Sequence, residues 1–311
     1  MSIRTILTPF TKDSDTPSVR MALALAKELE AHVDGIYVEP PQRSVPVTAH
    51  VPAMSAVGVG GYGAAVTTSR GPATPDPVAE ATRVRDQWAS AAKSHFEQLC
   101  HKHEVRFLDT DQPDRRGAHP LPCASYRREA GSMEQVISQH AHAYDMMVTE
   151  SAAVAPEAKP ARAAIDTALL QSGRPVLLAP IHPPENLDGR VLVAWNGSPQ
   201  CWHALSTALP FMTKAKEVVL FHAGKDGWTE RQEEERAADY LAWHGIKAEV
   251  VQHEPGEVGV ADYLMSQCNE RQVGLMVMGA YSHSPLRERL LGGVTLSMLT
   301  RSAATPVLMV H

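Results

Sequence analysis

Two parts of the chain end in the same pattern, an apolar run with methionines followed later by a proline and a second apolar run. This repeated ending indicates the fold. The first part joins 144–150 (YDMMVTE) to 173–180 (GRPVLLAP), and the second joins 273–280 (VGLMVMGA) to 304–311 (ATPVLMVH). Aligning the methionine runs gives an offset of 129 residues, and aligning the prolines of the two endings gives 131. Because the two anchors nearly agree, the sequence contains an internal repeat.

The segments upstream of each ending match as well. In each copy a short β-rich run leads through a polar loop into a helix-like stretch, and a β-branched run follows. The matched segments are the opening strands 3–8 and 190–194, the helices 19–29 and 202–209, and the second strands 32–38 and 217–223. The apolar second strands are typical of strands buried in a parallel sheet.

Each copy carries a further helix, strand and helix before its closing pattern. These predicted elements are 77–103, 105–108 and 133–142 in the first copy, and 229–244, 247–252 and 258–270 in the second. Strands that alternate with helices predict a parallel sheet, because a parallel crossover needs a connection of about this length. The expected fold is α/β, with two tandem doubly wound domains.

Length and composition agree with two domains. A chain of 311 residues, 44% hydrophobic and 21% charged, suits two globular cores of roughly 150 residues each. We expect the first domain at 1–180, with an insertion at 39–76 rich in Pro, Gly, Ala and Ser, and the second at 189–311. The junction 181–188 (IHPPENLD) holds paired prolines, which cannot continue a strand.

Charge and hydropathy exclude several classes of function. The net charge of −6 gives no overall positive field to hold a nucleic acid. No apolar run approaches the roughly 18 residues of a membrane span, and the N-terminus turns polar too early for a signal peptide, so we expect a cytoplasmic protein without membrane contact. The four cysteines form no CxxC pair, which indicates reduced thiols and no zinc knuckle.

One loop lies where open parallel sheets bind ligands, beyond the carboxyl end of a strand. It runs from Gly279 to Thr295 and reads GAYSHSPLRERLLGGVT. Gly279 lets the chain turn off the strand, and Gly292 and Gly293 let backbone N–H groups approach an anion at a helix N-terminus. His283 or Arg287 is the candidate to add positive charge. The loop therefore predicts a phosphate-binding site.

This loop resembles the C-terminal signature of the universal stress protein family, whose nucleotide-binding members carry Gly-x2-Gly-x9-Gly-Ser/Thr. The spacing is intact from Gly279 through Ser282 to Gly292, but Ser282 replaces the second glycine and Gly293 replaces the final hydroxyl residue. Serine is unfavourable at positive φ, and its side chain adds bulk where a phosphate would lie. Ser282 and Thr295 are the candidates to supply a hydroxyl instead.

The opening loop of the second copy, 194–198 (AWNGS), resembles the family's Asp-Gly-Ser turn on the adenine and ribose side of the ligand. Asn196 stands at the acidic position, where it keeps an acceptor and loses the charge. The resemblance implies that the site is formed by Ala194, Asn196, Ala223, Met278, Gly279, Ser282, His283, Gly292, Gly293, Val294 and Thr295. In the first copy the matching loop has no glycine, and Glu150 puts negative charge where phosphates need donors, so we expect no nucleotide there.

At fold level the resemblance covers nearly the whole chain. It implies an adenine nucleotide alpha hydrolase-like fold in two domains packed as a pseudo-dimer, with 175–179 pairing edge to edge with 306–311. It further implies a stress-response regulator that senses ATP with Mg²⁺ and has no dedicated catalytic residues. Two alternatives stay open: a module that holds another small ligand or anion or serves as an assembly surface, and a slow ATP hydrolase. Partner proteins and a homodimer are compatible with each.

Three weaker patterns have ordinary structural interpretations. The sequence 58–63 matches GxGxxG, but no strand and helix frame it, which favours a loop. His95, Cys100, His101 and His103 lack zinc spacing and are interpreted as a surface cluster, with a soft metal as the alternative. The charged run 230–236 (ERQEEER) is predicted to be a solvated helix face.

Overall fold

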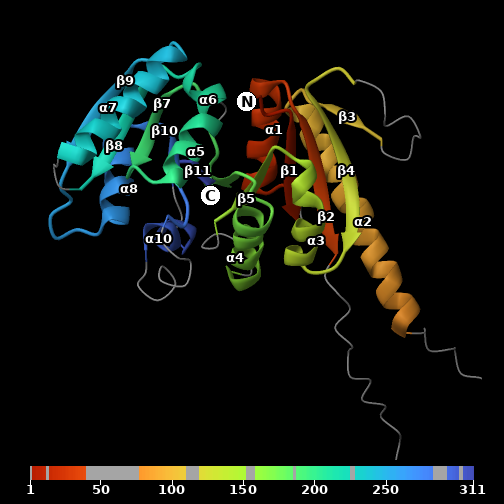
Figure 1. Cartoon of the computed structure of the whole chain (residues 1–311). Coiled ribbons are helices and arrows are strands. Elements are labelled where there is room, and N and C mark those ends of the chain that lie inside the picture. Colours follow the sequence, from red (N-terminus) through yellow and green to blue (C-terminus); the bar gives the residue numbers. More distant parts are fainter. Residues whose placement is uncertain are drawn as a thin grey trace, which may run out of the picture.

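The computed structural model describes residues 2–11, 14–39, 77–109, 119–151, 158–184, 187–224, 228–282, 293–300 and 304–311. We call residues up to 180 the N-terminal half and those from 189 the C-terminal half; the two lie side by side (Figure 1). The N-terminal half contains β1 (Thr5–Phe10), α1 (Pro17–Leu29), β2 (His32–Glu39), α2 (Pro77–Lys102), β3 (Arg106–Leu108), β4 (Cys123–Ala130), α3 (Met133–His140), η1 (Ala141–Ala143), β5 (Met146–Glu150), α4 (Ala158–Asp166), the π-helical turn η2 (Thr167–Gln171) and β6 (Val176–Ala179). The C-terminal half contains β7 (Arg190–Trp195), α5 (Pro199–Thr207), α6 (Leu209–Met212), β8 (Glu217–Ala223), α7 (Trp228–Trp243), β9 (Ala248–His253), α8 (Val260–Glu270), β10 (Val273–Gly279), α10 (Val294–Thr300) and β11 (Val307–Val310).

All these strands form one sheet of eleven strands, in the order β3-β4-β2-β1-β5-β6-β11-β10-β7-β8-β9. Strands within each half are parallel, and the halves join where β6 pairs antiparallel with β11, Val307 opposite Leu178 and Met309 opposite Val176. The order β4-β2-β1-β5-β6 repeats as β9-β8-β7-β10-β11, which confirms the internal repeat. The predicted edge pairing between the two closing strands is confirmed too.

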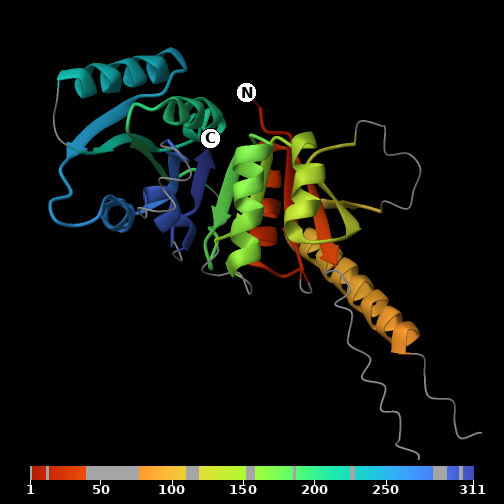
Figure 2. The ribbon, with the colours of Figure 1, turned by 60° about the horizontal axis from the view of Figure 1, so that its bottom comes forward.

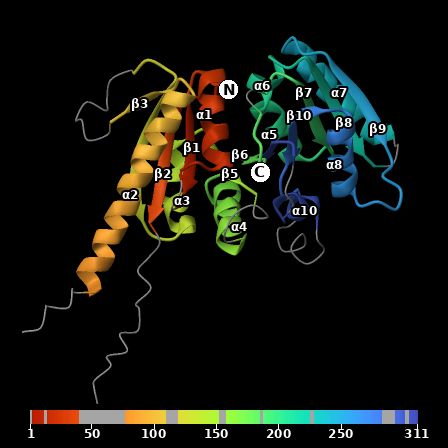
Figure 3. The same cartoon turned by 180° about the vertical axis from the view of Figure 1, so that it is seen from behind.

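Helices cover both faces of this sheet, as a doubly wound fold requires. One buried cluster lies under α1, α2, α5, α6 and α7, and a second lies under α3, α4, α8 and α10. The two sides are seen in Figures 1 and 3, and Figure 2 shows the start of α2 extending away from the body. The predicted tandem α/β architecture is therefore confirmed.

The first helix of each half starts in the same way. Thr16 accepts a hydrogen bond from the backbone of Val19, and Ser198 accepts one from the backbone of Cys201. A proline follows each cap, where its missing N–H is no loss and its fixed φ suits a helix. These caps explain why α1 and α5 begin two and three residues before the ranges predicted from apolar spacing.

The match predicted between the strands 105–108 and 247–252 is wrong. β3 exists at Arg106–Leu108, but β4 takes the place in the N-terminal half that β9 takes in the C-terminal half, pairing with β2 along eight residues. The sequence of β4, CASYRREA, has charged residues through its second half and lacks a β-branched run. Its strand conformation depends on pairing with β2 and β3, so local pattern did not reveal it.

The predicted insertion, 39–76, begins one residue too early, because β2 extends through Glu39. Glu39 is the last residue of β2 and is buried, and its carboxylate pairs with Arg85 on α2 at 2.9 Å and with Arg128 on β4 at 2.8 Å. A buried carboxylate needs such partners, because an unpaired charge in the interior is strongly destabilising. The rest of the insertion, including the GxGxxG match at 58–63, lies outside the described residues.

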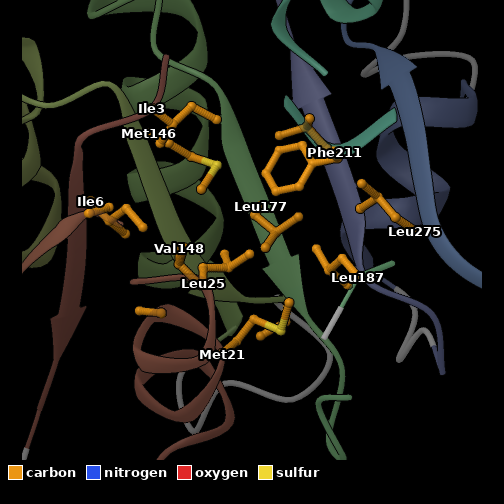
Figure 4. Packing of buried hydrophobic residues seen from close by; sticks show 14 of the residues in the cluster. Ile3, Ile6, Met21, Leu25, Met146, Val148, Leu177, Leu187, Phe211 and Leu275 are labelled. Atoms are coloured by element: carbon orange, nitrogen blue, oxygen red, sulfur yellow. The ribbon is translucent and has the colours of Figure 1, made fainter. Parts of the chain in front are cut away.

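A buried apolar cluster spans the junction between the halves. Leu177 of β6, Leu187 of the connecting segment, Phe211 of α6 and Leu275 of β10 belong to the same core, and Figure 4 shows them beside side chains from α1. Burying side chains of this size stabilises a protein by about 1.5–3 kcal/mol each. The carboxylate of Glu28 on α1 also accepts a hydrogen bond from the backbone of Leu187, at 3.0 Å.

Within the described part of the chain, no helix is long and apolar enough to cross a membrane. All four cysteines are free and buried, as expected for reduced thiols. Cys100 is buried in the core while His101 is exposed on α2, so the cluster near the end of that helix does not converge. No three His, Cys, Asp or Glu residues of the described ranges come together as metal ligands.

Candidate functional site

The candidate ligand loop leaves β10 against the first turn of α5. A Cβ atom on Gly279 would lie 2.8 Å from the backbone nitrogen of Cys201 and 2.8 Å from the carbonyl carbon of Gln200. Such distances are too short for any side chain, so only glycine fits unless α5 moves. Gly279 therefore allows a close approach of two backbones, which places the end of β10 beside the N-terminus of α5.

The turn after β7 is held by the side chain of Asn196. Its Oδ1 accepts hydrogen bonds from the backbone N–H of Ser198 at 3.1 Å and from the Cys201 thiol at 2.9 Å. Its Nδ2 donates to the hydroxyl of Ser282 at 3.3 Å. Gly197 supplies the positive φ, 70°, that this tight turn needs. The turn at Asn196 and the loop at Ser282 thus meet, as predicted. However, Oδ1 of Asn196, the acceptor expected to face a ribose, already accepts hydrogen bonds from Ser198 and Cys201.

Among the residues of the loop that the structure describes, Tyr281 is left-handed, with a φ of 56°, and Ser282 is not. The backbone N–H of Tyr281 donates to the hydroxyl of Thr295 at 3.1 Å, which ties the end of β10 to the start of α10. Serine at position 282 therefore carries no left-handed strain. Its remaining departure from glycine is its side chain, which bonds Asn196.

Small apolar side chains line the carboxyl ends of the central strands on the α8 and α10 face. Ala194 of β7 pairs with Met278 of β10 and with Phe221 of β8. Ala223 and Val294 pack against the same buried cluster, and Thr295 is buried beside it. Ala194 and Ala223 thus place short apolar side chains at the ends of two neighbouring strands on this face.

Gly293 lies at the far end of the loop, where α10 begins. Gly293 precedes α10, and its carbonyl accepts the first hydrogen bond of that helix, from Ser297 at 3.1 Å. His283 and Gly292 lie outside the described residues. The structure thus brings the described members of the predicted set to one edge of the sheet, at the ends of β7, β8 and β10 and the start of α10.

A hydrogen-bonded pair at this edge, His222 and Glu234, was not predicted from the sequence. Nδ1 of His222, near the end of β8, lies 2.6 Å from a carboxylate oxygen of Glu234 on α7, and Glu234 is 3% exposed. The prediction that the run 230–236 is a solvated face is therefore wrong for Glu234. The sequence contains no signal for it, because four of the seven residues in that run are glutamates and only the contact with β8 distinguishes Glu234 from the others.

The equivalent edge of the N-terminal half is built differently. Glu150 ends β5 at the position of Gly279, since it pairs with Ala179 as Gly279 pairs with Val310. Burial raises the pKa of the Glu150 carboxyl, while hydrogen bonds from Ser18 and Thr16 at the start of α1 lower it by less. A carboxyl group thus occupies the place where the C-terminal half has only a glycine.

The raised pKa of Glu150 predicts a pH-dependent effect of Glu150→Gln. A carboxyl whose pKa is higher in the folded state stabilises the fold fully below its ordinary pKa near 4.5, and this contribution is lost as the pH rises through the folded pKa. Glutamine lacks that loss. We expect the stability of the variant relative to the unmodified protein to increase from pH 4 to pH 7 in urea unfolding. Glu257→Gln, at an exposed site, is the matched control, and a difference that is flat or falls with pH contradicts the prediction.

We compared the sequence and the structure with those of known proteins. No model of a known protein family and no curated protein matches the sequence. A universal stress protein from Archaeoglobus fulgidus DSM 4304 superposes with a TM-score of 0.64, covering 99% of this chain and 96% of its own at 14% identity. A functionally unknown protein from Pseudomonas aeruginosa PAO1 superposes with a TM-score of 0.52, covering 99% of this chain and 92% of its own at 13% identity.

A single-copy neighbour matches less of the chain. It is a universal stress protein solved in complex with cAMP, which covers 40% of this chain and 98% of its own at 22% identity, with a TM-score of 0.34. The internal repeat, the parallel halves and the full-length match to the archaeal protein agree with one another. The chain therefore has the fold of the universal stress proteins, in two copies joined through β6 and β11.

Proposed function

We propose that this protein is a cytoplasmic stress-response regulator whose C-terminal domain binds an adenine nucleotide, ATP with Mg²⁺. Its two domains are residues 1–180 and 189–311. The nucleotide lies over Ala194, Ala223 and Met278, with its phosphates at Gly279, Ser282 and the start of α10. Nucleotide binding shifts the contacts between the domains or with a partner protein, and the protein acts as a regulator and not as an ATP hydrolase.

The observation that carries this proposal is the convergence at one sheet edge. The close approach at Gly279, the bond from Tyr281 to Thr295 and the bond from Asn196 to Ser282 bring both motifs of the C-terminal half together. The N-terminal half has the same strands but carries Glu150 at the matching place. A nucleotide is therefore assigned to the C-terminal half alone.

A second candidate function rests on the bond between Asn196 and Ser282. This bond bridges the two loops at 3.3 Å, across the space where a ribose and phosphate would pass. If the hydrogen bond between Asn196 and Ser282 persists, this edge of the sheet binds a smaller ligand, such as an inorganic anion at the N-terminus of α10, or a protein partner. The two functions differ in whether the bridge opens for ATP.

The test is calorimetric titration with ATP and Mg²⁺, with cAMP as a second probe and inorganic phosphate as the small anion. We expect Ser282→Gly, which removes the bridge, to tighten ATP binding by about tenfold, equivalent to about 1.4 kcal/mol. A ligand at 100 times its Kd should add about 2.7 kcal/mol to the stability of the fold. Ser266→Gly, on α8 and away from both motifs, is the matched control.

Two outcomes would overturn the nucleotide proposal. One is that millimolar ATP stabilises neither the unmodified protein nor Ser282→Gly in thermal unfolding. The other is binding of phosphate but not ATP, which favours the small-anion function. Release of inorganic phosphate from ATP over hours, measured in parallel, reports directly on the slow hydrolase alternative.

A further inference from the structure

One side chain of the candidate loop crosses from the C-terminal half into the N-terminal half. The hydroxyl of Tyr281 donates a hydrogen bond to a carboxylate oxygen of Asp166, the last residue of α4. Both residues are buried, Tyr281 at 2% and Asp166 at 9% exposure. Helices α4 and α10 lie near each other on the same face of the sheet (Figures 1 and 2).

We propose that Asp166 is a positioning residue of the ligand site in the C-terminal half, and that it acts through Tyr281. The proposal rests on the function proposed above, because it concerns the same loop. It means that the second copy is not a self-contained binding unit. The N-terminal half, whose matching segment has no glycine, supplies the anchor, Asp166, which sets the backbone conformation of Tyr281 and the position of Ser282.

The polar groups around the anchor are suited to a fixed hydrogen bond. Arg162, one turn before Asp166 on α4, places its Nε 3.7 Å from the other carboxylate oxygen, so the carboxylate has a partner on each side. Burial, followed by the bond to Asp166, raises the pKa of Tyr281. The phenol therefore keeps its proton at neutral pH and remains a donor to the carboxylate, and a hydrogen bond to a charged acceptor is stronger than a neutral one.

The backbone of Tyr281 explains why an anchor is needed. The left-handed region is unfavourable for a non-glycine residue, and such a conformation persists only where its surroundings fix it. Three contacts fix it here: the side chain bonds Asp166, the backbone N–H bonds Thr295, and the preceding Ala280 N–H bonds the carbonyl of Val310 at 2.7 Å. Ser282 follows directly, so the anchor also sets where its hydroxyl meets Asn196.

The residue types needed for the Tyr281–Asp166 contact do not recur at the symmetric positions of the sequence. With the offsets of 129 and 131 residues between the copies, the symmetric pair would be Ala152 and Ser297. Alanine has no hydroxyl to donate, and serine has no carboxylate to accept. The asymmetry of the anchor therefore follows the asymmetry of the motif, because the tyrosine occurs in the copy that keeps the glycines.

The simpler interpretation is that Tyr281 and Asp166 only hold the two halves together. The two interpretations differ in what Asp166→Ala does beyond lowering stability. A cohesive contact changes the unfolding free energy and leaves the loop and its ligand affinity unchanged. A positioning contact changes the backbone at Tyr281, and Asp166→Asn, which keeps an acceptor oxygen of the same reach, restores it.

The experiment measures amide hydrogen exchange at Tyr281 and the Kd for ATP with Mg²⁺ in the full-length protein. We expect Asp166→Ala and Tyr281→Phe to speed exchange of the Tyr281 amide and to raise the Kd, each by about tenfold, as loss of a bond to a charged group predicts. Asp166→Asn should stay within about threefold of the unmodified protein in both readouts. Tyr240→Phe, on α7 in the opposite helix layer, is the matched control.

The exchange measurement needs no ligand. The positioning role of Asp166 can therefore be disproved independently of nucleotide binding. If ATP does not bind the unmodified protein, the proposed function is overturned, and exchange at Tyr281 alone decides the role of Asp166. If Asp166→Ala leaves exchange at Tyr281 within twofold of the unmodified protein, or leaves the Kd unchanged where ATP binds, the positioning role is overturned. Faster exchange that Asp166→Asn reverses supports it.

Discussion

Gly279→Ala should lower the free energy of unfolding by about 2–3 kcal/mol, which is a large loss for the addition of one methyl group. The new Cβ would lie 2.8 Å from backbone atoms of Gln200 and Cys201, and backbone cannot rotate away as a flexible side chain can. Relief requires α5 to move from the end of β10. Because Asn196, Ser198 and Cys201 share hydrogen bonds at this place, the same movement should disturb the turn after β7.

Gly274 offers a matched control on the same strand. A Cβ there would meet its nearest atoms, in Gly189 and Arg190, at 3.7 Å, which is ordinary van der Waals contact. Gly274→Ala should therefore change stability by less than about 1 kcal/mol, and the reduced freedom of the unfolded chain favours the variant. Urea unfolding of both variants checks this pair. Equal stabilities of the two alanine variants would show that the end of β10 and α5 are not in close contact.

Phe211→Ala should destabilise the protein by about 3–5 kcal/mol. Phe211 is fully buried on α6 in the core that spans the junction, together with Leu177, Leu187 and Leu275 (Figure 4). Removing its ring leaves a cavity lined by residues of both halves. Since β6 and β11 pair directly beside this core, the two halves should unfold in a single transition in the unmodified protein.

Trp243→Ala is the control for Phe211→Ala. Trp243 is a larger aromatic residue at the end of α7 and is 91% exposed, so its removal should change stability by less than about 0.5 kcal/mol. Calorimetry of the unmodified protein and both variants gives the unfolding free energy and the number of transitions. Two separate transitions in the unmodified protein, or a loss below about 1 kcal/mol in Phe211→Ala, would contradict a shared core.

Local patterns in the sequence determined the elements that repeat and the class of fold. Apolar periodicity and the two closing motifs located most of the helices and strands within one to three residues, and the equivalence of Glu150 and Gly279 is confirmed by their pairing with β6 and β11. The motif spacing located the candidate loop, whereas its meeting with the turn at Asn196, 86 residues away in sequence, was implied only by the family resemblance. The elements and the loop itself depend on residues close together in sequence, where periodicity and turn chemistry act.

Only the tertiary structure decided the features that depend on distant partners. β4 is a strand because β2 lies beside it, Glu234 is buried because His222 faces it, and Asp166 reaches the ligand loop because β6 and β11 bring α4 next to Tyr281. A contact between residues far apart in sequence, such as Tyr281 and Asp166, does not alter local periodicity, since any acceptor side chain of similar length could accept the same hydrogen bond. The sequence by itself determined two similar α/β copies and a marked loop in the second, whereas long-range packing decided that the first copy completes the surroundings of that loop.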